Sequence, residues 1–167
     1  MNRREAIKMD EREVDAFLAH ARTATCATIG PRGWPHLAPL WYVLRAAGGG
    51  EPGPRIWAWT YAKSQKVVNL ERDPRATIQV EDGERYEELR GVVLDCDVRL
   101  HRDTEVVADV GGELMRRYSV APGEEPPLDL APEAQAAVDA QASKRVALEF
   151  VERRRTSWDH RRLGGSY

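Results

Sequence analysis

The chain has 167 residues, of which 42% are hydrophobic and 31% are charged, and its formal net charge is −2. This is the size of one ordinary domain, so we expect residues 1–167 to form a single unit with a core of its own. A nearly neutral chain offers no basic field to nucleic acid or to an anionic membrane, which argues against both as partners.

The N-terminal sequence and the cysteines indicate a cytoplasmic protein. No apolar run approaches the roughly 20 residues of a membrane helix, and the first residues, MNRREAIKMDERE, lack the apolar stretch of a signal peptide. Cys26 and Cys96 each lie in a predicted strand, where a buried free thiol is more natural than a disulfide. No Cys or His spacing indicates a metal site.

The first part of the chain is predicted to form one helix followed by three strands. Apolar residues recur at helical spacing from Met9 to Ala21, with Asp10 as the expected N-cap. Small and β-branched residues then predict strands at Thr23–Ile29, Trp34–Leu44 and Arg55–Thr60. A glycine- and proline-rich loop at 48–54 separates the second strand from the third.

The second half continues this pattern. The predicted elements are a helix at Ser64–Arg72, strands at Arg75–Val80 and Arg90–His101, a helix at Thr104–Tyr118 with Thr104 as its cap, a short helix at Gln135–Ala140, a strand at Arg145–Phe150 and a tail at Thr156–Tyr167.

These elements predict a mainly β fold with short helices, built as a six-stranded antiparallel barrel and not as a βαβ fold. The glycine-rich nucleotide loops GxGxxG and GxxxxGK[ST] are absent.

A helix start after the aromatic third strand is the first candidate site. Lys63, Ser64 and Lys66 place one hydroxyl and two ammonium groups at the first turn, where free backbone N–H groups and the helix dipole favour an anion. The pattern is typical of a phosphate cradle. The alternative is an ordinary solvated helix start.

The same stretch carries a family resemblance. The order Ser64-x-Lys66-x-x-Asn69-Leu70, followed by Asp73-Pro74-Arg75, resembles the flavin-binding split barrels of the pyridoxamine-phosphate-oxidase-like superfamily, as does the upstream pattern from Thr25 to Trp41. The resemblance implies a split β-barrel in which Lys66 and Ser64 hold the cofactor phosphate, with Lys63 as a weaker candidate.

Residues along the cofactor ring are also implied by the resemblance. For Trp57 and Trp59 the alternative is that one is a core residue and the other a surface or interface residue. The ring-lining candidates are Pro39, Leu40, Trp41, Trp57, Ala58, Trp59 and Thr60.

The C-terminal tail, residues 151–167, is similar at Thr156–Arg161 to the ends of actinobacterial members. In such barrels the site lies across a homodimer interface. The resemblance therefore implies that Trp158, His160 and Arg161 of a partner close the site over the substrate. For His160 the alternative is a solvated tail histidine.

The implied function is an oxidoreductase that uses FMN or the deazaflavin coenzyme F-420 to transfer a hydride to a small organic substrate. The compact size and actinobacterial character favour F-420. No catalytic side chain is assigned, and the incomplete set of basic residues argues against a true pyridoxamine-phosphate oxidase. The alternative is a non-catalytic flavin or haem binder, with His36, His101 or His160 as the axial ligand; otherwise His36 and His101 are expected at the surface or at a sheet edge.

Overall fold

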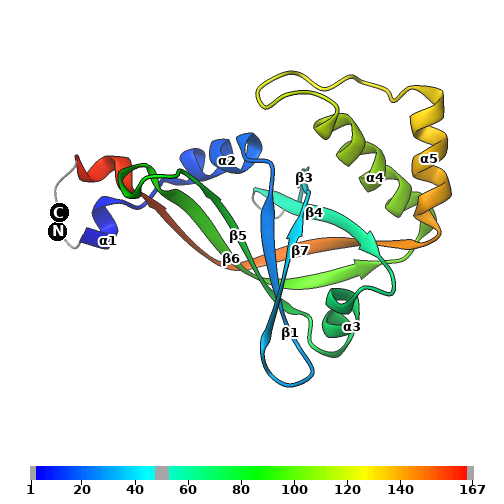
Figure 1. Ribbon diagram of the computed structural model, residues 1–167, viewed down its shortest axis with the longest axis horizontal. Helices are drawn as coiled ribbons and strands as arrows, with labels where there is room; N and C mark the ends of the chain where they lie inside the picture. Colours follow the sequence, from blue (N-terminus) through cyan, green and yellow to red (C-terminus); the bar gives the residue numbers. More distant parts are fainter. Residues whose placement is uncertain (1–2, 48–52, 165–167) are drawn as a thin grey trace.

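The computed structural model describes residues 3–47 and 53–164. Its strands form one antiparallel sheet in the order β2-β1-β5-β6-β7-β4-β3, with helices at its faces and ends (Figure 1). The predicted loop at 48–54 lies mostly outside the described residues. In chain order the elements are α1 (Arg3–Ala6), α2 (Glu11–His20), β1 (Ala24–Ile29), β2 (Pro35–Leu40), β3 (Val43–Ala46), β4 (Pro54–Tyr61), α3 (Gln65–Arg72), β5 (Arg75–Asp82), η2 (Tyr86–Glu88), β6 (Arg90–His101), α4 (Thr104–Tyr118), α5 (Pro132–Ala142), β7 (Arg145–Asp159) and η3 (His160–Leu163).

The mainly β class with short helices is confirmed, but the prediction of a six-stranded barrel is wrong, because the sheet has seven strands and is not closed. The expected strand Trp34–Leu44 is divided into β2 and β3, which gives seven strands. The division occurs because Tyr42 leaves the ladder: its N–H donates to the Tyr118 hydroxyl at 3.0 Å and its own hydroxyl donates to the Leu18 carbonyl at 2.6 Å. Among the described residues no pairing joins β2 to β3, so the sheet stays open.

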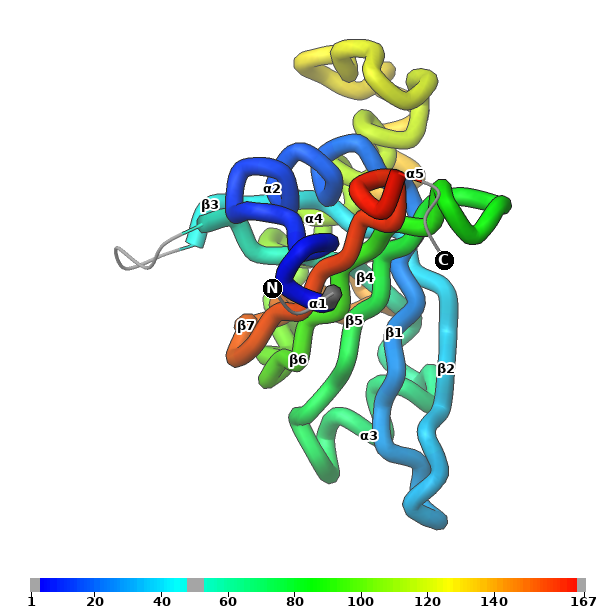
Figure 2. The backbone as a smooth tube through the Cα atoms, turned by 90° about the vertical axis from the view of Figure 1, so that its left-hand side faces the viewer, coloured from blue at the N-terminus to red at the C-terminus, as the bar shows by residue number. Residues whose placement is uncertain are grey.

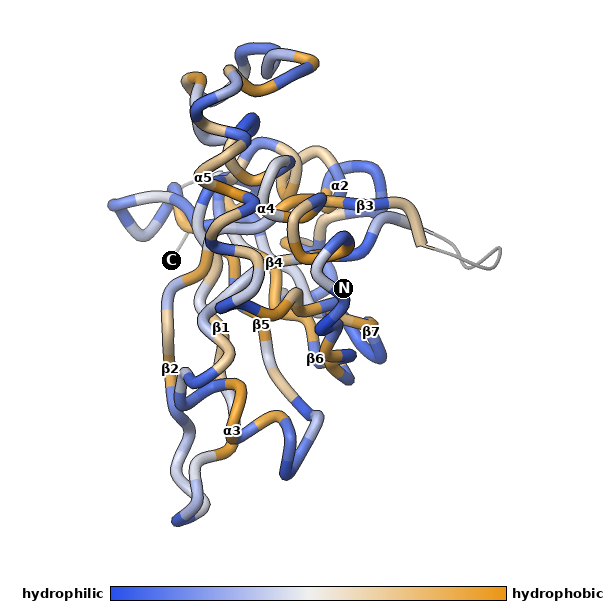
Figure 3. The backbone as a smooth tube through the Cα atoms, turned by 90° about the vertical axis from the view of Figure 1, so that its right-hand side faces the viewer, coloured by the Kyte–Doolittle hydropathy of each residue, from blue (hydrophilic) through white to orange (hydrophobic). Residues whose placement is uncertain are grey.

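The main core lies on the inner face of the sheet, closed by α2 and α3. The predicted alternation in β6 is confirmed, because Val92, Leu94, Cys96 and Val98 are buried in this core while Asp95 points to solvent. Figure 3 shows apolar and polar residues interleaved along α3, as expected for a helix with one buried face.

A second, smaller core lies on the opposite face, where α4 and α5 pack over β4, β7 and β3. Helix α4 is capped by Asp103 and not by the predicted Thr104, since the Asp103 carboxylate accepts from the N–H groups of Glu105 at 3.0 Å and Val106 at 3.1 Å. A carboxylate one residue earlier reaches these N–H groups from the true N-cap position.

Strand β7 is much longer than predicted. It was expected to end at Phe150 and continues to Asp159, so residues 151–159 extend the strand and pair with β6 of the same chain. The segment from Glu152 to Arg155 is charged because much of this part of the strand faces solvent, which hides it from a search for apolar runs.

Both cysteines are free and buried, as predicted. No helix within residues 3–47 and 53–164 has both the length and the apolar character needed to cross a membrane.

Candidate functional site at the start of α3

Helix α3 lies beside strand β1, on the other side of the sheet from α4 and α5 (Figures 1 and 2). The chain enters α3 next to the end of α5, where the Ala62 N–H donates to the Lys144 carbonyl at 3.0 Å. Ser64 is the N-cap of α3, yet its side chain makes no capping hydrogen bond. Its Oγ is buried and has no partner within the described part of the chain. A buried hydroxyl normally finds a partner, so the Ser64 hydroxyl is available to a ligand.

Lys66, in the first turn of α3, supplies a half-buried cation. Its Nζ donates to the Thr60 Oγ1 at 3.0 Å, and Thr60 is itself buried at the end of β4. Burial lowers the pKa of Lys66, and the nearby Cys26 acts weakly in the opposite direction. Lys66 has no carboxylate partner among the described residues. An anion entering here would supply the missing counter-charge.

Cys26, buried on the inner face of β1, is near enough to Lys66 to interact with it electrostatically. Burial raises the pKa of this thiol to about 12, so it is uncharged at neutral pH and does not neutralise the ammonium. The cysteine therefore acts as a small apolar residue of the inner face.

The structure adds a polar network that the sequence did not single out. The Asn69 amide donates to the Thr28 Oγ1 at 3.0 Å and its Oδ1 accepts from the Gln65 Nε2 at 2.9 Å. Asn69 is completely buried. This network fixes the first turn of α3 against β1. The only sequence signal was Asn69 within the family pattern, since no local rule pairs it with Thr28.

His36 lies in β2, which is an edge strand of the sheet, in agreement with one of the places expected for it. It was expected at the surface, at a sheet edge or as a haem ligand. In the structure it is half-buried in β2 opposite Thr28, and its Nδ1 is buried without a partner. Lys63, in contrast, is exposed at the rim of the cradle.

The tryptophans Trp57 and Trp59 do not face the cradle. They share one face of β4, opposite to Ala58 and Thr60, and both pack into the smaller core beneath α4. The Trp57 ring stacks on His101 at 4.8 Å, and the Trp59 ring lies against Gly111. The alternative of one core and one surface tryptophan does not hold, because residues two apart in a strand share a face and both rings pack against the same core.

The β2 candidates are divided between two faces. Leu40 is buried in the main core, whereas Pro39 is exposed on the outer face. Trp41 is 52% exposed, and one face of its ring stacks on Tyr118 at 4.3 Å with an interplanar angle of 10°.

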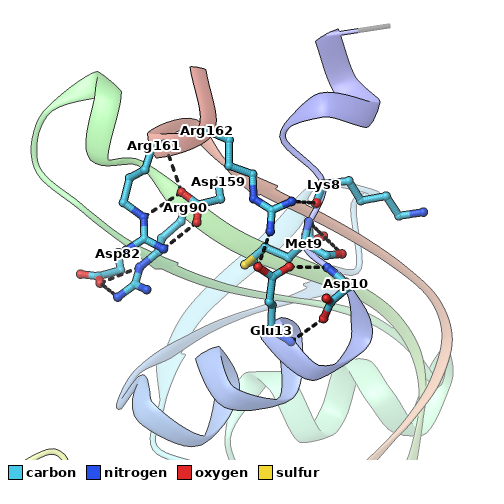
Figure 4. Close-up of polar contacts among 10 residues, drawn as sticks. Lys8, Met9, Asp10, Glu13, Asp82, Arg90, Asp159, Arg161 and Arg162 are labelled. Carbon is cyan, nitrogen blue, oxygen red and sulfur yellow. Dashed lines mark hydrogen bonds and ion pairs between the residues drawn. The ribbon is translucent and has the colours of Figure 1, made fainter. Parts of the chain in front are cut away.

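The three tail residues lie at the far end of β7 from the cradle (Figure 1), and Figure 4 shows one of them, Arg161, beside Asp159. Thr60 pairs with Val146, and Trp158 is twelve residues further along, which is about 40 Å of strand. There Trp158 covers Gly91, the His160 Nδ1 contacts the Tyr86 carbonyl at 2.9 Å, and Arg161 pairs with Asp159 at 2.6 Å. Within one chain these residues do not reach the cradle.

The residues at the start of α3 fit the phosphate of a flavin-type cofactor. They combine a half-buried cation in Lys66, a free hydroxyl in Ser64 and the N–H groups of a helix start. Of the candidates expected for this site, the structure gathers Thr60, Ser64 and Lys66.

Comparisons with known proteins agree with this fold. The model of the pyridoxamine 5'-phosphate oxidase family matches residues 10–150. The conserved hypothetical protein Rv2991 from Mycobacterium tuberculosis is 38% identical, covers 100% of this chain and 95% of its own, and superposes with a TM-score of 0.82. A search of curated proteins gives no match.

Two more distant structures share the fold. An F420 reductase is 21% identical, with 85% of this chain and 94% of its own covered at a TM-score of 0.55. An FAD-binding protein from Mesorhizobium loti is 16% identical, with 90% and 94% covered at a TM-score of 0.62. The family model over most of the chain and the 38% identical homologue over its whole length confirm the resemblance, and the chain belongs to the pyridoxamine 5'-phosphate oxidase family.

Proposed function

We propose that the protein binds a flavin or deazaflavin cofactor through its phosphate and works as an FMN- or F-420-dependent oxidoreductase that reduces a small organic substrate. The observation that carries this proposal is the half-buried Lys66 ammonium, which has no carboxylate partner in the described chain and lies in the same helix turn as the unpartnered Ser64 hydroxyl.

Each residue of the cradle has a separate role in this proposal. Lys66 supplies charge, and Thr60 holds the ammonium in place by accepting its hydrogen bond at 3.0 Å. Ser64 donates from its free hydroxyl. The bound cofactor would supply hydride-transfer chemistry. The apolar inner face, which includes Ala58 and Cys26, keeps water away from the neighbourhood of the cradle.

Of the two cofactors we favour F-420. The F420 reductase among the structural neighbours supports a deazaflavin, and the FAD-binding neighbour supports flavin-type binding more broadly. Both similarities are at the level of the fold. The cradle itself recognises a phosphate and does not distinguish the two ring systems.

The proposal includes a homodimer in the cytosol. Trp158, His160 and Arg161 lie about 40 Å of strand from the cradle of their own chain, so only a second copy could bring them to it. The outer face of the β1–β2 hairpin also exposes Trp34 (76%) and Leu37 (65%), apolar surface that a second copy would bury. Two buried free thiols suit a reducing compartment.

The test is a fluorescence titration of the purified protein with FMN and, separately, with F-420. We expect one of the two to bind tightly and Lys66→Ala to weaken that binding by roughly 10- to 100-fold, since a hydrogen bond to a charged group is worth about 1.5–3 kcal/mol. Lys8→Ala is the matched control, because it removes an exposed lysine that lies outside the cradle.

Other outcomes are equally informative. Equal losses in the two lysine variants would contradict a specific cradle at Lys66. Binding of neither cofactor by the wild-type protein would contradict the reductase proposal, and a Soret band in the purified protein would support the haem alternative.

The dimer has its own test. Sedimentation at micromolar concentration should give twice the mass of the chain, and mixing Lys66→Ala subunits with Arg161→Ala subunits should restore activity that neither variant has alone. A monomer, or mixtures as inactive as their components, would contradict a site shared between subunits.

A further inference from the structure

Five buried side-chain polar atoms have no hydrogen-bond partner within the described residues, and two of them belong to the hairpin side of the molecule. These two are the Ser64 Oγ and the His36 Nδ1. The other three belong to Trp57, Gln141 and Arg145, on the side of the molecule that α4 and α5 cover. Ser64 already belongs to the cradle, so His36 is the atom that calls for an explanation.

A continuous path of contacts joins His36 to the first turn of α3. His36 lies opposite Thr28 in the β1–β2 register, and directly opposed side chains on one face are about 5 Å apart. Thr28 accepts from Asn69 at 3.0 Å, and Asn69 accepts from Gln65 at 2.9 Å. Gln65 directly follows the N-cap Ser64.

The alternation of β2 sets the direction of the His36 side chain. Its neighbours Pro35 and Leu37 are exposed, whereas Thr28, its partner across the ladder, is 1% exposed on the inner face. A strand places alternate residues on opposite faces, so His36 shares the inner face with Thr28 and not the outer face with Leu37. A polar ring on this face without a partner is unfavourable unless a ligand satisfies it.

We propose that His36 is a further residue of the phosphate site, and that its buried Nδ1–H donates a hydrogen bond to a phosphate oxygen of the cofactor. This inference rests on the proposed function. In that arrangement β2 contributes to the cradle from the side opposite to Lys66, while the Thr28–Asn69–Gln65 network keeps the hairpin and α3 at a fixed separation.

The experiment compares each cofactor with its form that lacks the phosphate. Affinities for FMN and riboflavin, and for F-420 and its phosphate-free deazariboflavin chromophore, are measured by fluorescence titration for the wild type, His36→Leu and His36→Asn. We expect His36→Leu to lower the affinity for the phosphorylated ligand by about tenfold or more while leaving the phosphate-free ligand unchanged. His36→Asn keeps a donor near Nδ1 and should lose at most about threefold.

His20→Leu is the matched control, since His20 is exposed on α2. It should bind like the wild type, and thermal melting of every variant verifies that it is folded. An equal loss for both members of a ligand pair in His36→Leu, or no loss at all, would overturn the role of His36 while the cradle at Lys66 stands. A wild-type protein that does not prefer the phosphorylated ligand would overturn the proposed phosphate site itself, and this inference with it.

Discussion

Arg117 caps the C-terminal end of α2, and Arg22 caps the C-terminal end of α4. Arg117, in the last turn of α4, donates through Nη2 to the Ala21 carbonyl at 2.6 Å and to the Ala19 carbonyl at 3.0 Å, at the end of α2. Arg22, just after α2, donates to the Arg117 carbonyl at 2.7 Å. The last carbonyls of a helix have no partner within it, so this exchange satisfies both ends and fixes α2 against α4.

We therefore expect Arg117→Ala to lower the free energy of unfolding by about 2–4 kcal/mol, because several part-buried carbonyls lose their donor at once. Urea denaturation measures the change. Arg116→Ala is the control: no partner of its side chain is seen within the described residues, and it should change stability by less than about 1 kcal/mol. A similar decrease in the free energy of unfolding in both variants would argue against a stabilising role for the hydrogen bonds from Arg117 to the end of α2.

Two adjacent glycines in α4 should respond in opposite directions to alanine. A Cβ at Gly111 would lie 2.5 Å from the Trp59 ring, so Gly111→Ala must displace packed atoms and should cost about 1–3 kcal/mol. A Cβ at Gly112 meets nothing nearer than 3.9 Å, and Gly112→Ala should stabilise the helix by up to about 1 kcal/mol. Thermal melting of the two variants gives the comparison, and a Gly111→Ala protein as stable as Gly112→Ala would contradict the packing of Trp59.

The cysteines should be unreactive in the folded protein. Burial raises the pKa of both Cys26 and Cys96 to about 12, and the thiolate is the reactive form. At pH 8 we expect a thiol reagent to modify neither residue on the timescale on which it modifies the protein in urea. Rapid modification of one thiol without denaturant would show that its environment is open to solvent.

Stability should decline in alkali. A cysteine with a folded pKa of about 12 and an ordinary value near 9 holds its proton in the folded state after the unfolded chain has lost it. Below pH 9 each thiol therefore makes its full contribution to the free energy of unfolding. That contribution falls by up to about 1.4 kcal/mol per pH unit for each thiol as the pH rises toward 12. Cys96→Ala should flatten this decline in urea melts between pH 9 and 11, and an unchanged slope would contradict the assignment.

The ion pair between Arg161 and Asp159 should stabilise the folded protein only at pH values at which Asp159 is ionised. The hydrogen bond from Arg161 lowers the pKa of Asp159, so the pairing contributes above the ordinary carboxyl pKa and is lost as pH falls through the lowered value. The melting temperature of Arg161→Gln should be below that of the wild type at pH 7, and the difference should shrink as the pH falls below the ordinary carboxyl pKa of 3.8. A difference that is constant over this range would contradict an ionic origin.

The parts of the fold that repeat a simple pattern could be predicted from the sequence. The strand Arg90–His101 was predicted with the bounds that the structure has, because its apolar residues alternate with period two. The start of α3 was predicted within one residue from Ser64 and the Asp73-Pro74 stop.

The remainder depends on contacts between distant residues. The break between β2 and β3 comes from Tyr42 bonding to α2 and α4, and nothing near residue 42 in the sequence announces these partners. The orientation of Trp57 and Trp59 depends on α4, which follows some fifty residues later and covers that face of β4. His36 and Asn69 enter the candidate site only through pairing with Thr28, which the register decides.

The residues of the proposed phosphate site come from one stretch of the chain, between Thr28 and Asn69, whereas the helical layer of α4 and α5 and the long strand β7 come from the second half. Recognition of the phosphate is thus encoded in one contiguous portion of the gene. A library for altered phosphate recognition needs to vary only that portion, and it leaves α4, α5 and β7 unchanged.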